Sequence, residues 1–108
     1  MVLAEIIYAL TATFPKSEIY GLSSQMRRAA VSVPSNIAEG SQRRSNPDFL
    51  RFISIAHGSL VELETQLILA SRIGYVEQEQ IQSTVKLLRE IAGMMYSFSK
   101  KLSLATDH

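Results

Sequence analysis

The sequence of 108 residues has no cysteine and no tryptophan, and it has only three prolines and five glycines. Without cysteine, disulfides and thiolate metal sites are excluded, and a cytoplasmic location is the simplest expectation. No apolar run approaches the ~20 residues that a membrane-spanning helix needs. The apolar first ten residues contain Glu5 and lack a basic leader and a small-residue cleavage pattern. We therefore expect a cytoplasmic protein with no signal peptide and no membrane partner.

Patterns that accompany catalysis are also missing. The sequence has no Gly-rich phosphate loop, no Gly-x-Ser-x-Gly nucleophile elbow and no spaced set of serine, histidine and acid. Glu62 and Glu64 could indicate a di-metal helical bundle, but such a site needs Glu-x-x-His on two helices, and neither His57 nor His108 follows a glutamate at that spacing. We expect no catalytic residue, metal, cofactor or small-molecule substrate, and a partly buried structural role for His57.

What is present is helical periodicity throughout. Apolar residues recur at steps of three and four, most regularly in the third segment, where the seam is Phe49, Ile53, Ala56, Leu60, Leu63, Leu67, Ala70 and Gly74. The pattern predicts a single all-α domain over residues 1–108, an antiparallel up-and-down four-helix bundle. Its helices are expected at about 2–13, 22–40, 47–73 and 78–102, with residues 103–108 frayed.

Capping and breaking residues place the helix ends. Pro15 ends the first helix and begins a connector over residues 15–21. Ser23 or Ser24 is expected to cap the second helix, and Asn46, followed by a proline and an aspartate, to cap the third. Gly74 is the expected stop of the third helix.

The second helix contains Pro34, and we expect it to bend between residues 30 and 35. Two shorter helices meeting at the proline are the alternative, but one apolar stripe runs through the proline without losing phase, which favours a single bent helix. That stripe is Leu22, Met26, Ala29, Ala30, Val33, Ile37 and Gly40.

A polar stripe borders this apolar face. A solvated surface is one interpretation, but serine and asparagine are poor helix formers and need compensation beside a proline. We therefore favour a buried or interfacial hydrogen-bond network, to which the third helix adds a serine and a glutamate. Gly58 and Ser59 in the middle of that helix indicate the close approach of another helix. The predicted network comprises Gln25, Arg28, Ser32, Asn36, Glu39, Ser59 and Glu62.

Apolar residues also lie outside the predicted core seams. In the third helix they lie roughly opposite the seam, where an isolated bundle would be polar. The fourth helix has a similar flanking stripe of Leu87, Ile91, Met94 and Phe98. Spare apolar faces on two long helices imply self-association. The candidate oligomer interface is Ile55, Gly58, Leu69 and Ile73.

Charge is unevenly distributed although the formal total is only +1. The segment from Arg27 to Arg51 contains five arginines and two acids, a net charge of +3, whereas residues 52–80 carry a net charge of −3. A solvated surface explains this for one monomer. A symmetric assembly would instead repeat the arginines into a patch that binds phosphates. The candidate nucleic-acid contacts are Arg27, Arg43, Arg44 and Arg51, with a lysine pair at 100–101 near the end of the fourth helix.

The run YGLSSQMRRAAVSVPSNIAEGSQRRSNPDFLRFISIAHGSLVELETQL, residues 20–67, resembles the four-helix-bundle family named after proteins encoded in intervening sequences of bacterial 23S ribosomal RNA. Matching positions in order and spacing are Gln25, Arg28, Ser32, 36–40 (NIAEG), Phe49, Ala56, Gly58, Ser59 and Glu62. The resemblance implies a bundle that assembles into a homopentameric barrel and whose activity is largely undefined.

Relatives of that family include the accessory protein of diversity-generating retroelements, a basic pentamer that works with a reverse transcriptase and nucleic acid. The resemblance therefore implies a non-enzymatic homo-oligomer, expected to be a pentamer, that contacts the phosphate backbone of RNA or DNA. The alternative is a scaffold for a protein partner, in which the arginines form only salt bridges between subunits.

Overall fold

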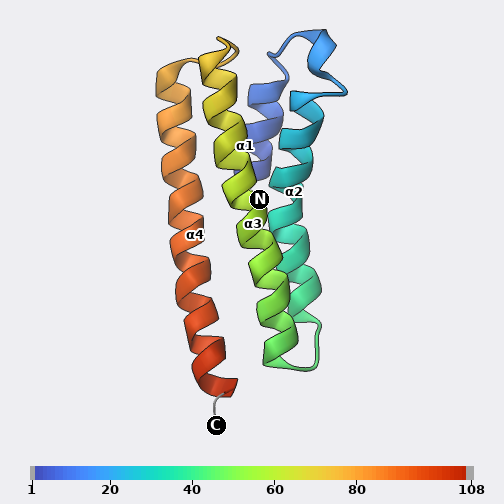
Figure 1. Cartoon of the computed structure of the whole chain (residues 1–108), viewed down its shortest axis with the longest axis vertical. Coiled ribbons are helices and arrows are strands. Elements are labelled where there is room, and N and C mark those ends of the chain that lie inside the picture. The colour runs from blue at the N-terminus through green and yellow to red at the C-terminus, as the bar shows by residue number, and fades with distance from the viewer. Residues whose placement is uncertain (1, 107–108) are drawn as a thin grey trace.

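A computed structural model describes residues 2–106 of the chain, and every regular element in this range is helical (Figure 1). The elements are α1 (Val2–Thr11), the 3₁₀ helix η1 (Lys16–Glu18), α2 (Leu22–Ser41), α3 (Asn46–Arg72) and α4 (Gln78–Thr106). The predicted all-α class and the four helices are confirmed.

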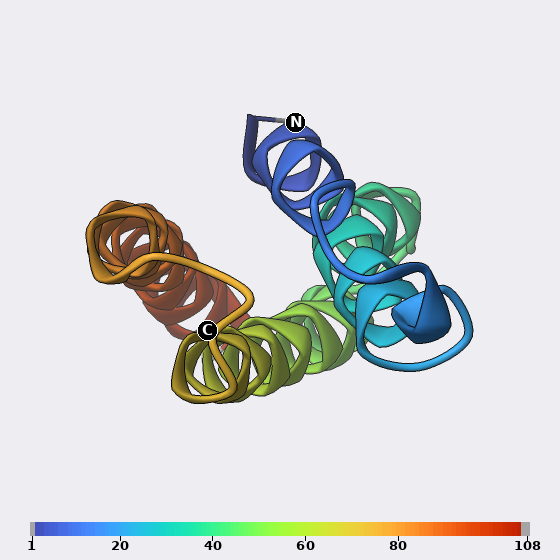
Figure 2. The same ribbon diagram turned by 90° about the horizontal axis from the view of Figure 1, so that it is seen from above.

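The helices run alternately up and down, because short connections join them (Figure 1). Seen from above, they follow an open arc in the order α1, α2, α3, α4, with α1 and α4 at its two ends (Figure 2). Helix α1 has 10 residues, against 20, 27 and 29 for the others. It therefore covers only the part of the bundle near the connector.

The predicted seams form the core. The seam of α3 is buried from Ile53 to Ala70, with Phe49 partly buried at its start. Helices α1, α2 and α4 contribute the apolar residues predicted from their spacing. The buried apolar side chains of these three helices are Leu3, Ile7, Leu10, Met26, Ala29, Ala30, Val33, Ile81, Leu88 and Met95.

Two of the predicted caps are wrong. Helix α2 begins at Leu22, whose backbone N–H donates to Oε1 of Glu18 at 3.1 Å. The carboxylate of Glu18 in η1 therefore caps the helix in place of Ser23 or Ser24. Helix α3 is capped by Ser45, whose Oγ accepts a hydrogen bond from the backbone N–H of Asp48 at 3.3 Å. Asn46, the expected cap, is already the first helical residue.

The outer helix ends also differ from the prediction. Helix α1 stops at Thr11 rather than residue 13, because the backbone N–H groups of Thr13 and Phe14 bond carbonyls only three residues back. Helix α4 continues to Thr106, so the predicted fraying of residues 103–106 is wrong. Residues 107–108 lie outside the described range.

The special backbone positions agree with the sequence. Pro34 lies inside one uninterrupted α2, so the two-helix alternative is wrong; the bend stays a prediction. After α3, Gly74 has φ +85°, and the backbone N–H groups of Gly74 and Tyr75 bond the carbonyls of Ser71 and Ala70 at 3.1 and 2.9 Å. This pattern is a Schellman cap, and it needs the left-handed conformation that glycine adopts readily.

Candidate functional site

Part of the predicted polar network joins α2 to α3. The Ser59 hydroxyl donates to Oγ of Ser32 at 2.8 Å. The Asn36 amide donates to the backbone carbonyl and to the hydroxyl of Ser32 at 2.8 and 2.9 Å. These contacts confirm that α2 approaches Ser59. They also give hydrogen-bond partners to Ser32 and Asn36, two poor helix formers that lie two residues to either side of Pro34.

The other four members of the predicted network are exposed and do not join it. Arg28 donates to the hydroxyl of Ser24 at 3.3 Å, Glu39 pairs with Arg43, and Glu62 accepts from the Gln66 amide at 3.1 Å. These partners lie four residues away in the sequence, because neighbouring turns on an outer face reach each other more easily than the facing helix does; Arg43 lies just beyond the end of α2. For Gln25, Arg28, Glu39 and Glu62 a buried network is wrong, and an interfacial one stays a prediction.

A surface depression of about 230 Å³ lies where this stripe meets α3. It is lined by Gln25, Arg28 and Ala29 from α2, and by Ser59 and Glu62 from α3, with Ser32 between them. Arg28 and Glu62 share this space, yet within residues 2–106 neither forms an ion pair. The depression therefore presents one cation and one anion, neither of which forms an ion pair within the described residues.

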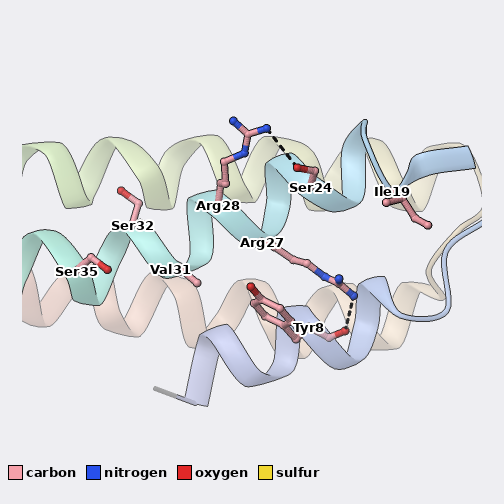
Figure 3. A pocket seen from close by; sticks show the side chains of 8 residues that line it. All are labelled: Tyr8, Ile19, Ser24, Arg27, Arg28, Val31, Ser32 and Ser35. Atoms are coloured by element: carbon pink, nitrogen blue, oxygen red, sulfur yellow. Dashed lines mark hydrogen bonds between the residues drawn. The ribbon is translucent and has the colours of Figure 1, made fainter. Parts of the chain in front are cut away.

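Arg27 lies apart from the other candidate arginines, as the close-up of a groove of about 620 Å³ between α1 and α2 shows (Figure 3). Its Nε donates to Oγ1 of the buried Thr11 at 2.8 Å, and its guanidinium lies 4.7 Å from the ring centroid of Tyr8. Figure 3 shows Arg28 extending away from Arg27. Through these two contacts Arg27, on α2, holds α1 against α2.

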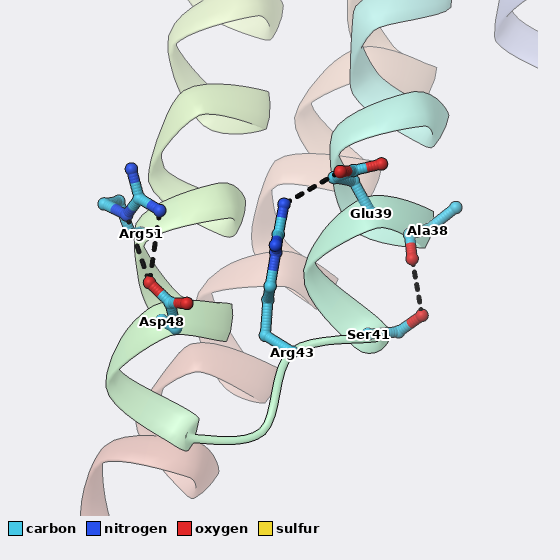
Figure 4. A network of polar contacts seen from close by, with 6 residues as sticks. All are labelled: Ala38, Glu39, Ser41, Arg43, Asp48 and Arg51. Atoms are coloured by element: carbon cyan, nitrogen blue, oxygen red, sulfur yellow. Dashed lines mark hydrogen bonds and ion pairs between the residues drawn. The ribbon is translucent and has the colours of Figure 1, made fainter.

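Arg43 and Arg51 lie on the two sides of the α2–α3 loop (Figure 4). Arg43 pairs with Glu39 at 2.8 Å, and Arg51 pairs with Asp48 at 3.1 Å. Both guanidinium groups also lie over the Phe52 ring, at 4.6 and 5.0 Å from its centroid. The structure thus brings Arg43 and Arg51 together.

Arg44 lies in the same loop, is exposed, and has no ion-pair partner in the described range. Arg27 is 14 residues before Ser41, the last residue of α2, which is about 21 Å along the helix axis, and Arg43 follows in the loop. The predicted set of four arginines is therefore a cluster of three at the loop and one structural residue elsewhere.

The spare apolar stripe of α3 is exposed. Ile55, Leu69 and Ile73 are 46%, 48% and 47% exposed, and a Cβ at Gly58 would have no neighbour within 4 Å. Of the pair Gly58 and Ser59, at which the close approach of another helix was predicted, α2 meets Ser59, whereas Gly58 has no such neighbour within the described residues. His57 is exposed as well, contrary to the partly buried role expected of it.

One contact between segments that are far apart in the sequence was not predicted from the sequence. The Tyr75 hydroxyl donates to Oε2 of Glu18 at 2.8 Å, across 57 residues, and the rings of Phe14 and Tyr75 are 5.2 Å apart. The hydrogen bond to Glu18, followed by burial and the carboxylate charge, raises the pKa of Tyr75 above its usual value. Glu18 thus ties η1, α2 and the end of α3 together.

Helix α4 is joined to α3 by an ion pair, in which Nε of Arg89 donates to Oε1 of Glu64 at 3.0 Å. This hydrogen bond raises the pKa of Arg89. Among residues 2–106 no group of three or more His, Asp or Glu side chains is placed to hold a metal ion. None of the helices in the same range is long and apolar enough to cross a membrane.

Fold and surface together define an all-helical bundle protein with exposed apolar and arginine-rich surfaces. The chain belongs to the 23S rRNA-intervening sequence protein family, whose model matches residues 1–97. Among curated proteins none matches the chain at a significant level.

A solved structure supports the same assignment. The crystal structure of a protein of unknown function from the S23 ribosomal protein family of Bacteroides thetaiotaomicron VPI-5482 superimposes with a TM-score of 0.79 at 28% identity. The match covers 92% of this chain and 90% of the other. The family resemblance inferred from residues 20–67 is therefore confirmed, and the bundle is common to both proteins.

Proposed function

We propose that this chain is a non-enzymatic accessory protein that assembles with copies of itself and binds the phosphate backbone of RNA or DNA. The observation that carries the proposal is the concentration of cations at one end of the bundle. Among the described residues that end carries Arg43, Arg44, Arg51, Lys100 and Lys101, against the acids Glu39 and Asp48, a net of +3. The contact between the Phe49 and Phe98 rings, 5.4 Å apart, brings this part of α4 beside the start of α3.

Assembly would multiply this charge. Ile55, in the exposed stripe of α3, follows Arg51 by about one helical turn on the same side of the helix. Contact through the stripe would therefore bring the arginine clusters of neighbouring copies close together. A surface of this kind binds phosphates without reading bases, and its affinity falls steeply as salt rises. The family resemblance leads us to expect five copies.

A protein scaffold is the second candidate, and one observation favours it. Arg43 and Arg51 already have carboxylate partners and a shared aromatic ring, which leaves Arg44 as the unpaired member of the loop cluster. Under this candidate the loop would meet a protein partner, and the ion pairs would serve only to order the loop.

The first test combines solution mass by light scattering with the binding of mixed-sequence RNA and DNA at low and high salt. We expect an oligomer whose nucleic-acid affinity drops by about tenfold or more between the two salt concentrations. The double variant Arg43→Glu, Arg44→Glu should lose binding at low salt. The matched control Lys16→Glu, Arg72→Glu reverses two exposed charges at the opposite end of the bundle and should retain it.

Two results would overturn the nucleic-acid proposal: no binding by the wild-type protein at low salt, or equal binding by the variant and its control. An oligomer with either result leaves the scaffold as the better function. For the assembly, Ile55→Asp or Leu69→Asp should give smaller species with helix content largely intact by circular dichroism. Native mass in both variants would exclude the α3 stripe as the interface.

A further inference from the structure

We infer that the depression between α2 and α3 receives the outer edge of α4 from a second copy of this chain, with Arg28 of one copy paired to Glu90 of the next. The inference rests on the proposed self-assembly and names the two faces that meet. It follows from three properties of the monomer: the unpaired charges in the depression, an unpaired charged edge on α4, and the equal height of the two along the bundle.

The depression has the chemistry of a docking surface rather than of a solvated face. Arg28 and Glu62 line it without an ion-pair partner, and the hydrogen-bonded hydroxyls of Ser32 and Ser59 lie between them. Ile55 is exposed on α3 about two turns from Glu62, toward the loop end. Small side chains between two helices, bordered by apolar ones, allow another helix to approach closely.

The outer edge of α4 offers the complementary groups. Lys86 and Glu90 are exposed, lie one turn apart, and form no ion pair within the described range. Further along the same edge, Met94 and Phe98 are 65% and 45% exposed. A Cβ at Gly93 would have no neighbour within 4 Å, so this part of α4 leaves room for close contact.

The two surfaces lie at the same height in the bundle. The Ser59–Ser32 hydrogen bond fixes the register of α2 against α3 and places Arg28, one turn further along, opposite Glu62. The Arg89–Glu64 ion pair fixes the register of α4 against α3 and places Glu90 at the level of residues 62–64. Copies related by rotation about an axis parallel to the bundle keep their heights, so Glu90 of one copy would meet the depression of the next.

Glu90 and Arg28 are opposite in sign. At the shared height Glu90 approaches Arg28 on the α2 side of the depression, whereas Lys86 lies one turn toward the connector end, beyond the level of Glu62. Helix α4 runs down toward the loop end, and Met94 and Phe98 therefore follow at the level where Ile55 is exposed (Figure 1). The contact would bury apolar and charged groups of both copies together.

The two faces are unlike, because one is formed by α2 and α3 and the other by α4, which stands at one end of the arc (Figure 2). Contacts between unlike faces repeat from copy to copy and close into a ring when the rotation allows it. This contact is therefore compatible with an assembly larger than a dimer. A symmetric dimer would instead join identical patches.

A charge-swap experiment tests the pairing. Single variants Arg28→Glu and Glu90→Arg should each weaken self-association by about tenfold or more, measured as the concentration dependence of mass in sedimentation and light scattering. The double variant Arg28→Glu, Glu90→Arg restores opposite charges and should recover most of the mass. Glu5→Arg, an equal charge reversal on the exposed side of α1, is the control and should assemble like the wild type.

The outcomes separate this inference from the proposed function. A monomeric wild-type protein would overturn both. If the wild type assembles and Ile55→Asp dissociates it, but Arg28→Glu and Glu90→Arg keep the native mass, the pairing is wrong while the self-assembly stands. Single variants that dissociate without recovery in the double variant would also overturn the pairing. Both charges are exposed, so unchanged helix content by circular dichroism is expected in each variant.

Discussion

The two ends of the bundle are held by different kinds of contact. At the connector end, Glu18 accepts hydrogen bonds from Leu22 and from Tyr75, which is 57 residues away in sequence. At the loop end, the ion pairs of Arg43 and Arg51 join residues four and three positions apart. The connector end therefore uses polar groups to join distant segments, whereas the polar groups of the loop end add little to the fold and are available to a partner.

This difference explains why similar arginines have different roles. Arg27 is half-buried and bonds a buried hydroxyl on another helix, so its loss affects packing between helices. Arg43 and Arg51 are exposed, and exposed local ion pairs contribute only about 0–1 kcal/mol to stability. What joins α2 to α3 at the loop end must therefore be apolar packing.

The largest expected effect tests that packing. A Cβ added at Gly40 would lie 2.7 Å from Cβ of Phe52 and 2.9 Å from Cδ1 of Phe49. We expect Gly40→Ala to lower the free energy of unfolding by about 1–2 kcal/mol, because the overpacking outweighs the helix propensity gained from alanine. Chemical denaturation monitored by circular dichroism measures it.

The matched control is Gly58→Ala on α3, where an added Cβ meets nothing. It should raise the free energy of unfolding by up to about 1 kcal/mol, through propensity alone. Equal effects of the two variants would show that the loop end does not depend on the close approach of α2 and α3. A Gly58→Ala variant that folds more stably but assembles less well would place Gly58 at the oligomer interface.

A smaller effect separates the two kinds of arginine. Arg27→Ala removes a hydrogen bond to Thr11 and the contact with the Tyr8 ring, and should cost about 1 kcal/mol. Arg51→Ala removes an exposed pair with Asp48 and should cost at most about 0.5 kcal/mol. Thermal unfolding at low and high salt checks the comparison, because only the Arg51 effect should shrink as salt rises. An Arg51→Ala cost as large as that of Arg27→Ala would contradict it.

Interactions between residues that are close in the sequence were predicted well, and interactions between distant residues were not. Apolar periodicity is local and strong, so the seam from Ile53 to Ala70 and the stop at Gly74 were predicted correctly. A helix cap depends on a single side chain. The cap of α2 is Glu18, which belongs to the separate element η1, and the spacing of residues within α2 does not predict it. The loop arginines were predicted as a group because they are close in sequence. Arg27 was misassigned to that group, since its partners come from α1.

The smallest expected effect concerns titration at the connector end. The hydrogen bond that Tyr75 donates to Glu18 raises the pKa of Tyr75 in the folded protein. The contribution of this bond to stability is therefore complete below the unfolded pKa of about 10 and is lost as the pH rises through the higher folded pKa. Titration of tyrosinate absorbance should show a step above the ordinary tyrosine pKa of about 10, and Tyr75→Phe should remove that step. Glu18→Gln removes the carboxylate charge and should return this step toward a pH of about 10. An unchanged titration in that variant would show that Glu18 does not control Tyr75.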